Sequence, residues 1–328
     1  MNILVTGGAG FIGSNVCREL ECDGLVGRVV ALDDLSTGLA SNLEGLDHVE
    51  LIIGSVLDDK LVTELAAGVD AIVHLAAVPN VARSLQRPRA SHEANATGTV
   101  VVLEAARAQD CYVIVASSSS VYGTGAALPA REEQPTFPVS PYAASKLAAE
   151  SYALAYARSF GLKVLALRLF NVYGPLQRAD HAYAAVIPAF VAAALGGSPL
   201  VFQGDGTQTR DFTYVGDVAT VICQALSRGV TSEGPVNLAF SSRTSLLSLA
   251  SEIEDLIGER VSRVNEAPRK GDVRDSQGDS TRLLSLFPKV IPTPLSEGLR
   301  ATIDWFSDLN GIPGAAKGVV RSQGQTVS

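Results

Sequence analysis

The residues at the start of the chain restrict its fold more than any other stretch. An apolar run at 2–6 is followed by GGAGFIG at 7–13 and then by a helical pattern to about residue 21. Glycines recur there as G-x-x-G-x-x-G, at Gly7, Gly10 and Gly13. Such glycines allow a tight turn and let the backbone approach a pyrophosphate, which then lies on the helix N-terminus. The order strand, glycine turn, helix predicts a dinucleotide-binding unit.

Two acidic residues stand where a dinucleotide would place its adenosine ribose. The second apolar run, 28–32, ends in Asp33 and Asp34, about twenty residues past the glycine turn. A carboxylate there accepts hydrogen bonds from the ribose hydroxyls and repels a 2′-phosphate, so the sequence favours NAD over NADP. The alternative interpretation of Asp33 is a turn residue or a helix cap.

Apolar runs and helical patterns then alternate along the first half of the chain. The expected strands are 49–54, 69–75, 111–117 and 163–169, and the expected helices are 88–108 and 142–160. This alternation predicts an α/β fold of the Rossmann type, with a doubly wound parallel sheet. Residues 1–170 form the expected NAD-binding domain.

From about residue 171 the sequence becomes richer in turns and predicts a smaller α/β substrate-binding lobe over 171–312, partly interleaved with the first domain. Its expected strands are 200–203 and 235–239, and its expected helices are 182–195, 216–228, 246–257 and 296–305, the last with Ser296 as N-cap. The tail 313–328 is rich in Gly, Ser and Gln, which predicts disorder.

Composition argues against several classes of partner. A net charge of −8 without a basic tract argues against nucleic acid and anionic membranes. No apolar run approaches the ~20 residues of a membrane span, and Met1 leads directly into a strand, so we expect a cytoplasmic protein. His74 ends an apolar run and is more typical of a structural residue than of a ligand. No metal site is expected, because no metal-binding spacing relates Cys17, Cys22, Cys111 and Cys223.

Tyr142 and Lys146 lie four residues apart in the alanine-rich helix expected over 142–160. They therefore share one helix face, one turn apart. In a pocket, the lysine charge would favour the phenolate and lower the tyrosine pKa from ~10, which makes a usable general base. The alternative is that both residues simply belong to an amphipathic face.

Several further motifs occur in order along the chain. They are LDDLSTG (32–38), HLAA (74–77), SSSSVYG (117–123), SPYAASK (140–146), RLFNVYGP (168–175), AYAAVIP (182–188), GDGTQTRDF (204–212) and GDVRDS (271–276). Together with GGAGFIG, they resemble the motifs of the extended short-chain dehydrogenases/reductases, and within them the NAD-dependent nucleotide-sugar 4-epimerases. The resemblance covers about residues 2–306.

The resemblance implies roles for individual residues. Tyr142 would be the base that removes the sugar hydroxyl proton, Lys146 would hold the nicotinamide ribose, and the Ser118 hydroxyl would bond the reacting oxygen, both donating and accepting. The acid that usually contacts adenine is Ser55 here, a departure that still leaves a hydrogen-bonding group. The implied NAD contacts are Gly7, Gly10, Phe11, Ile12, Gly13, Asp33, Asp34, Ser55, Val56, Leu75, Ala76, Ala77, Asn95, Tyr142 and Lys146.

The resemblance also implies a UDP-sugar substrate gripped by residues of both halves. Arginine suits the two phosphates because its planar fork donates hydrogen bonds in pairs. An arginine in such loops can instead be a solvated surface charge. The implied substrate residues are Ser118, Ser119, Ser120, Asn171, Arg178, Val186, Ile187, Arg210 and Arg274.

The reaction is narrowed by two serines. All these relatives remove hydride from sugar C4 to give a 4-keto intermediate, and 4,6-dehydratases then use an Asp-Glu pair that follows the catalytic hydroxyl residue. Here those positions hold Ser119 and Ser120, which cannot supply a carboxyl acid–base pair. Epimerisation at C4 is the simplest reaction left, while decarboxylation of UDP-glucuronate stays open.

Arg178 suggests which sugar is bound. It follows GPLQ at a position where UDP-glucuronate 4-epimerases carry an arginine, and its guanidinium would pair with a C5 carboxylate. The hypothesis is therefore UDP-glucuronate to UDP-galacturonate, unless Arg178 points to solvent. UDP-N-acetylglucosamine and UDP-glucose remain alternatives, since AYAAVIP and GDGTQTRDF look most like epimerases of UDP-N-acetylhexosamines and their uronic acids.

Two other classes of protein share this fold. A non-catalytic NAD-binding regulator is disfavoured because such proteins usually lose the tyrosine or the lysine, and a reductase that releases its cofactor is an intermediate case. The resemblance also implies a homodimer that pairs through the helices from about 90 and 142. Close helix packing there, or packing within one chain, would use Ala143, Ala144, Ala148, Ala149 and Ala153.

Overall fold

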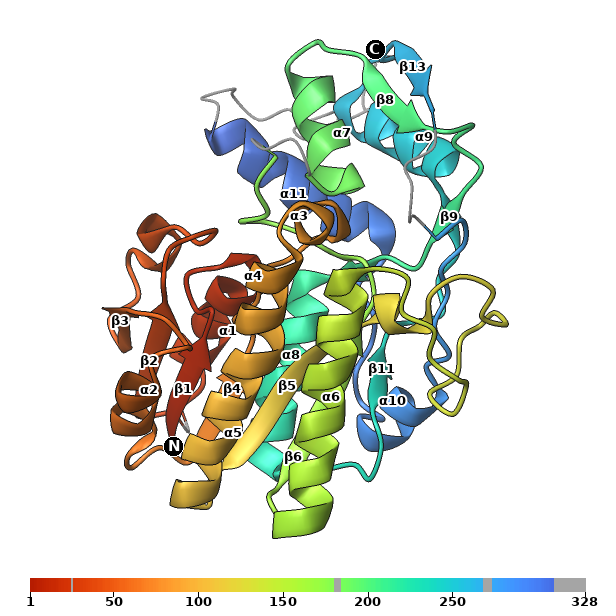
Figure 1. Ribbon diagram of the computed structural model, residues 1–328. Helices are drawn as coiled ribbons and strands as arrows, with labels where there is room; N and C mark the ends of the chain where they lie inside the picture. Colours follow the sequence, from red (N-terminus) through yellow and green to blue (C-terminus); the bar gives the residue numbers. More distant parts are fainter. Residues whose placement is uncertain (25, 180–183, 268–272, 310–328) are drawn as a thin grey trace.

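Seven strands form the central sheet, in the order β11-β6-β5-β4-β1-β2-β3, and every pairing is parallel (Figure 1). The structure, a computed structural model, describes residues 1–24, 26–179, 184–267 and 273–309. The order reverses between β1 and β4, which creates the crevice where such sheets bind ligands. The strands are β1 Asn2–Thr6, β2 Arg28–Asp33, β3 Val49–Ile53, β4 Ala71–His74, β5 Tyr112–Ser118, β6 Val164–Leu169 and β11 Val236–Leu238.

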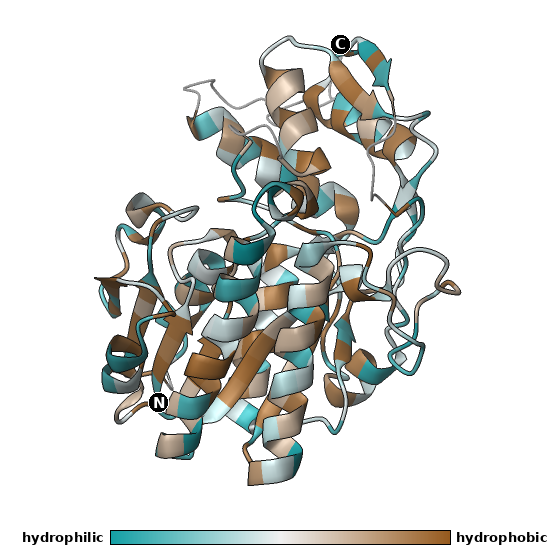
Figure 2. Cartoon of the chain, viewed as in Figure 1, coloured by the Kyte–Doolittle hydropathy of each residue, from teal (hydrophilic) through white to brown (hydrophobic). Residues whose placement is uncertain are grey.

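Helices cover both faces of this sheet, so its strands are nearly continuous apolar runs, as Figure 2 shows for β5. On one face α1 packs against α8, and on the other α2 packs against α5 and α5 against α6. The α/β doubly wound prediction is confirmed. The helical elements are α1 Phe11–Glu21, η1 Ala40–Leu43, α2 Asp59–Ala66, α3 Val81–Gln86, α4 Pro88–His92, η2 Glu93–Thr97, α5 Gly98–Gln109, η3 Ser119–Tyr122, α6 Pro141–Phe160 and α8 Val215–Arg228.

The remaining elements, apart from α10 beside β11, form a second lobe at the end of the sheet where α3 lies (Figure 1). Its core is apolar and joins α7, α9 and α11. Strand β11 and helix α8 follow the first part of this lobe in sequence yet belong to the sheet, so the lobe is discontinuous in the chain. The remaining elements are β7 Val172–Tyr173, α7 Val186–Leu195, β8 Leu200–Gln203, β9 Thr209–Arg210, β10 Thr213–Tyr214, β12 Thr244–Ser245, α9 Leu246–Ile257, β13 Arg263–Glu266, α10 Thr281–Leu286 and α11 Leu295–Leu309.

Several local predictions differ from the structure. The helix expected over 88–108 is three consecutive pieces, because η2 is a π-helical turn between α4 and α5. Ser296 is not an N-cap, since α11 already begins at Leu295. The predicted disordered tail, 313–328, lies outside the described residues, as do residues 182–183 of AYAAVIP and 271–272 of GDVRDS.

Local sequence explains why α6 begins and ends where it does. The Ser140 hydroxyl accepts a hydrogen bond from the Ala143 amide at 3.1 Å, and Pro141 occupies the first turn, where its missing N–H costs nothing. Gly161 ends the helix at φ +73°, a conformation that favours glycine. The helix is thereby fixed relative to β5, against which it packs.

Candidate active site

A cavity of about 1170 Å³ lies at the carboxyl ends of the strands, where residues of the sheet and of the second lobe face each other. Its sheet side includes the glycine turn, the end of β2 and the start of α6. Its lobe side includes the start of α7 and the β9 strand. A volume of this size exceeds the ~300–1,000 Å³ of ordinary small-molecule sites, and it suits a dinucleotide together with a nucleotide sugar.

The glycine turn is packed against the end of β4. A Cβ on Gly7, which has φ +71°, would lie 2.7 Å from the Ala76 amide nitrogen, and a Cβ on Gly13 would lie 2.1 Å from the Gly7 carbonyl oxygen. Helix α1 starts after Gly10 with no side-chain cap. Its first amides therefore remain available to an anion in the cavity, as phosphate binding at a helix N-terminus requires.

Asp33 is fixed by the glycine turn. Its carboxylate accepts hydrogen bonds from the Ala9 amide at 3.0 Å and the Leu35 amide at 2.9 Å. Burial raises the pKa of Asp33, while these amides counteract the rise. Asp34 is exposed and accepts a bond from the Ser36 amide at 2.9 Å. Both acids line the cavity, and Asp33 is the better-oriented ribose acceptor.

Most other predicted cofactor residues line the cavity, but Asn95 does not. Asn95 is buried behind the wall, where its Oδ1 accepts from the Val78 amide at 2.7 Å and its Nδ2 donates to the Ser145 hydroxyl at 2.9 Å. Asn95 therefore supports the wall and helix α6 rather than facing the cavity. The residues that do line it are Gly7, Gly10, Phe11, Ile12, Gly13, Asp33, Asp34, Ser55, Val56, Leu75, Ala76, Ala77, Tyr142 and Lys146.

Tyr142, Lys146 and Ser118 come together at the centre of the cavity wall. The Lys146 ammonium donates to the Ala116 carbonyl at 2.8 Å, and the Ser118 hydroxyl faces the Tyr142 phenol closely enough to lower its pKa against the effect of burial. Ser118 Oγ also accepts hydrogen bonds from the Ser120 amide at 3.2 Å and the Ser120 hydroxyl at 2.9 Å. With both acceptor positions occupied, the Ser118 proton is directed towards Tyr142 and the cavity.

The expected lowering of the Tyr142 pKa by Lys146 is not observed. Burial raises the pKa of Tyr142, and the opposing influence comes from the Ser118 hydrogen bond. The Lys146 charge is itself disfavoured, since burial lowers its pKa to about 8. The physical reason is burial. Loss of water around Tyr142 and Lys146 disfavours both the charged phenolate and the charged ammonium.

The predicted substrate residues divide into those that face the cavity and one that does not. Arg274 is 74% exposed, lies outside the cavity wall and pairs with Asp205. Arg210, on β9, lines the cavity and donates to the Arg274 carbonyl at 2.8 Å. The others that line it are Ser118, Ser119, Ser120, Asn171, Arg178, Val186 and Ile187.

The cavity wall also contains residues that sequence reasoning missed. Arg83, on α3, is a third arginine of the wall, beside Arg178 and Arg210. The sequence feature that could have identified Arg83 is its position nine residues after His74, shortly after the HLAA motif at the end of a central strand. Asn80, just before α3, and Leu176 hold positive φ values of 88° and 70° and also line the cavity, as strained residues at functional sites do.

Comparison with known proteins matches this geometry to a family. The model of the family described as "NAD dependent epimerase/dehydratase family" matches residues 3–239. The chain belongs to this family. The predicted family, the NAD cofactor and the enzymatic nature of the protein are thereby confirmed.

The relatives of this epimerase/dehydratase differ in reaction and sugar. It is 38% identical to a UDP-glucose 4-epimerase of Mycolicibacterium smegmatis, over 93% of this chain and 98% of that one. It is 33% identical to a UDP-N-acetyl-α-D-glucosaminuronate decarboxylase of Bacillus cytotoxicus, over 93% and 98%. The structure of a UDP-glucuronic acid 4-epimerase from Bacillus cereus with UDP-glucuronic acid and NAD has 30% identity and a TM-score of 0.84, over 94% and 100%.

The residues present fit bound NAD. The α1 N-terminus without a side-chain cap offers amides to a pyrophosphate, and the Asp33 carboxylate stands at the end of β2 for a ribose. A side chain at Gly10 would meet only the Gly7 carbonyl, at 3.1 Å, and would otherwise occupy this wall of the cavity. Among the described residues, no helix of this epimerase/dehydratase is long and apolar enough to cross a membrane.

Proposed function

We propose that the protein inverts C4 of UDP-glucuronate to give UDP-galacturonate, through a 4-keto sugar. The observation that carries the proposal is the position of Arg178. It lines the same cavity as Tyr142 and Ser118, which supports a pose in which one hexose contacts all three. A desolvated guanidinium pairs with a carboxylate at C5, worth ~1.5–3 kcal/mol, and gives a neutral CH₂OH much less.

In this mechanism the chain's own residues control the proton and the sugar. Tyr142 takes the proton of the C4 hydroxyl, and Ser118 donates a hydrogen bond to the same oxygen. Lys146 supplies positive charge beside the phenolate as it forms. Bound NAD supplies the acceptor that takes hydride from C4 and returns it. For inversion, the keto sugar must turn over between the two transfers, and the cavity volume supports this movement.

Epimerisation is favoured over dehydration by where the acids lie. Among the described residues of the cavity wall, the carboxylates are Asp33 and Asp34, at the end of β2 expected to hold the adenosine ribose. The wall beside Ser118 has the hydroxyls of Ser119 and Ser120 instead. A hydroxyl is a poor acid or base near neutral pH, so elimination of water from C5 and C6 lacks its catalyst.

The second lobe is the proposed site of the UDP group. Arg210 supports this assignment because it lines the cavity from β9, where its guanidinium can bind phosphate in bidentate fashion. Asn171 donates to the Asp211 carbonyl at 3.0 Å and lines the cavity beside the start of α7 at Val186 and Ile187. Arg274 would act indirectly, because its backbone carbonyl accepts a hydrogen bond from the Arg210 guanidinium and so orients that side chain.

Decarboxylation is the competing reaction, and a decarboxylase among the relatives favours testing it. A 4-keto uronate is a β-keto acid, so loss of carbon dioxide competes with return of hydride. Holding the carboxylate by a fixed cation opposes its departure, because the charge pair stabilises the ionised, intact group. The two outcomes differ in product: a hexuronate keeps the carbon that a pentose has lost.

The test compares three substrates and two variants. The purified protein is incubated with UDP-glucuronate, UDP-glucose or UDP-N-acetylglucosamine, and products are separated by chromatography and mass. We expect UDP-galacturonate as the main product, and a fall of roughly 10–100-fold in kcat/KM for UDP-glucuronate alone in Arg178→Ala. Arg89→Ala, which removes a 91% exposed arginine on α4, is the matched control and should change nothing.

The outcome that contradicts the carboxylate hypothesis is turnover of a neutral UDP-sugar alone, unaffected by Arg178→Ala. A UDP-pentose as the main product would replace epimerisation by decarboxylation. A nicotinamide absorbance change proportional to turnover would identify a reductase that releases its cofactor.

A homodimer and a cytoplasmic location remain predictions. Ala143, Ala149 and Ala153 pack within the chain, so these alanines do not serve a partner. A stripe on the other face of α6 stays accessible, with Ala144 exposed and Tyr152 48% exposed two turns later. This stripe supports pairing of α6 with a second copy, which light scattering of the purified protein measures.

A further inference from the structure

Three consecutive residues at the end of β5 face one side of α6. The Ala116 carbonyl accepts from Lys146 at 2.8 Å, and the Ser118 hydroxyl faces the Tyr142 phenol, whose pKa it lowers. Between them, the Ser117 hydroxyl donates to Glu150 Oε2 at 2.6 Å. Positions 142, 146 and 150 are each four apart, so they form one stripe on the helix. Glu150 is thus the third residue of the helix face that carries the catalytic pair.

Glu150 is held in place by Arg168, which projects from the neighbouring strand β6. Arg168 donates from Nη2 to Oε1 at 2.6 Å and from Nε to Oε2 at 2.9 Å, and both side chains are only 4% exposed. With the Ser117 bond, the carboxylate accepts three hydrogen bonds within the protein. Burial works against the charge of Arg168, yet Glu150 keeps the Arg168 pKa above its ordinary value.

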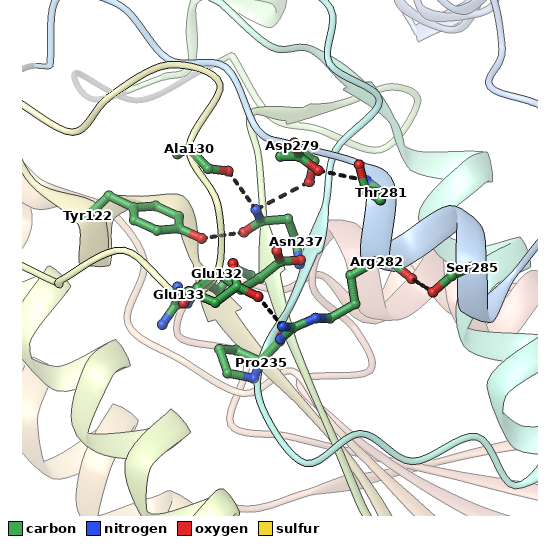
Figure 3. A network of polar contacts seen from close by, with 11 residues as sticks. Tyr122, Ala130, Glu132, Glu133, Pro235, Asn237, Asp279, Thr281, Arg282 and Ser285 are labelled. Atoms are coloured by element: carbon green, nitrogen blue, oxygen red, sulfur yellow. Dashed lines mark hydrogen bonds and ion pairs between the residues drawn. The ribbon is translucent and has the colours of Figure 1, made fainter.

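The guanidinium of Arg168 is itself fixed from the other side. It lies 4.7 Å from the centroid of the Tyr122 ring, and its Nη1 donates to the Glu132 carbonyl at 3.4 Å. The Tyr122 ring is held in turn by the contacts in Figure 3. Its hydroxyl donates to Asn237 Oδ1 at 2.6 Å, and Asn237 Nδ2 donates to the Ala130 carbonyl at 2.9 Å. The Glu150–Arg168 ion pair is therefore surrounded by groups that are themselves hydrogen-bonded in place.

A buried ion pair is a poor way to gain stability. Desolvation of the two charges offsets most of their attraction, and apolar replacements of similar volume are often as stable. What such a pair supplies is geometry, because a bidentate arginine–carboxylate contact fixes both distance and orientation. Here the geometry that it fixes is the distance between β5, which carries Ser118, and α6, which carries Tyr142.

We infer that Glu150 and Arg168 are positioning residues that hold the end of β5 against α6, so that Ser118 and Tyr142 meet the same substrate oxygen. The inference rests on the proposed function, in which these two residues act together. A displacement of about 1 Å in such an arrangement costs ~100-fold in rate. The pair acts through Ser117 and the helix face, without contact to the substrate.

The experiment uses the full protein with its bound NAD and measures kcat, KM, the pH dependence of kcat and thermal stability. In Glu150→Gln the carbonyl can still accept from Ser117, but the charge that holds Arg168 is lost. In the double variant Glu150→Met/Arg168→Met both charges are removed together, so no unpaired charge stays buried. We expect a 10–100-fold fall in kcat with little change in KM for both, and wild-type stability for the double variant.

The pH profile separates positioning from a merely structural role. Because the Ser118 bond lowers the Tyr142 pKa, loosening it should move the acid limb of the kcat profile to higher pH in both variants. The matched control is Glu64→Gln, which breaks the exposed Lys60–Glu64 pair on helix α2 and should leave kcat and the profile unchanged.

Two results overturn the inference, and they are distinguishable. If Tyr142→Phe retains activity, the proposed function fails and the positioning role fails with it. If Tyr142→Phe is inactive but the double variant is folded and keeps the kcat and pH profile of the original protein, the positioning role alone is wrong. Should Glu150→Gln not fold, the double variant still decides between these results.

Discussion

The glycine turn, on the sheet side of the cavity, and the lobe side are held in position by different kinds of contact. On the sheet side, the glycine turn fits against the end of β4 through the backbone, as the 2.7 Å approach of a Gly7 Cβ to the Ala76 nitrogen shows. Asp33 is then oriented by the Ala9 and Leu35 amides. These contacts join residues at the ends of adjacent parallel strands, so the strand order itself brings them together.

On the lobe side, buried polar side chains join segments that are otherwise linked only by very short strand pairs. Asp211 is fully buried and accepts hydrogen bonds from the Ser242 amide and hydroxyl and from the Gly278 amide, at 3.2, 2.8 and 2.9 Å. Burial raises the pKa of Asp211, while these donors counteract the rise. The strands there are only two residues long in β7, β9, β10 and β12.

The difference indicates how each side can change. A backbone-fitted turn tolerates almost no substitution and serves a cofactor common to all substrates. Loops joined by a few polar side chains can be rearranged while the sheet stays intact, which suits a family whose members act on different sugars. Substitutions on the sheet side should therefore affect every substrate alike, and those on the lobe side should affect substrate binding first.

The largest effect should come from Gly13→Ala. The new Cβ would lie 2.1 Å from the Gly7 carbonyl oxygen, a backbone atom that cannot move without opening the turn. Overpacking of this kind costs ~1–3 kcal/mol, and we expect most bound NAD to be lost, with activity on every UDP-sugar down ~100-fold. The measurements are the NAD content of the purified protein and its kcat.

The control for that substitution is Gly24→Ala, because no atom lies within 4 Å of its added Cβ. It should retain NAD and activity. If Gly13→Ala also retains both, the glycine turn tolerates an added side chain, and the predicted difference between the sheet side and the lobe side is wrong.

A smaller effect, confined to the lobe side, should follow Asp211→Asn. The amide keeps one acceptor oxygen but turns an NH₂ group towards amides that also donate, which costs ~1–3 kcal/mol. We expect KM for the UDP-sugar to rise about 10-fold, with NAD content and kcat nearly unchanged, because Asn171 and Arg210 lie next to the disturbed loops. Steady-state kinetics and NAD content measure this.

Asp255→Asn provides the matched control, since Asp255 is 73% exposed on α9 and pairs with Arg260 at 3.7 Å. It should leave KM unchanged. A loss of NAD in Asp211→Asn would show that the two sides are coupled rather than separate.

The same contrast explains what could be predicted from the sequence. The turn at Gly7 to Gly13 and the helix after it are local, so residue spacing alone identifies them, and the expected Tyr142, Lys146 and Ser118 indeed share one cavity wall. The hydrogen bonds of Asp211 instead reach residues 31 and 67 positions away. Nothing in the local pattern signals such partners.

Two differences between the sequence prediction and the structure have the same origin. Asn95 is predicted at the cofactor, but its partners Val78 and Ser145, 17 and 50 residues away, hold its side chain behind the cavity wall. The Tyr142 pKa was expected to fall, but the depth of burial depends on how the whole chain packs. Residue type and spacing predict which groups gather at a site, whereas their solvation and exact neighbours are set by tertiary structure.

The smallest effect should come from His74, a buried histidine at the end of β4 on the sheet side of the cavity. Burial, and then the Lys146 charge, lower the pKa of His74 to about 3, so the ring is neutral near neutral pH. Thr99 Oγ1 donates to the Asn95 carbonyl at 2.6 Å and therefore accepts from His74 Nε2 at 2.9 Å. In the neutral ring, His74 Nδ1 accepts from Thr6 Oγ1 at 2.7 Å.

Between pH 3 and 6.5 the unfolded chain binds a proton at His74 that the folded protein does not, so the free energy of unfolding falls as pH falls through 6.5. His74 should contribute a loss of about 1 kcal/mol from pH 7.5 to 5.5 in denaturant titrations. In His74→Gln the amide can donate to Thr99 and accept from Thr6, so that part of the pH dependence should vanish. His48→Gln, at an exposed position, should keep it. Equal slopes in all three proteins would show that His74 titrates alike in the folded and unfolded chain, so that burial does not lower its pKa.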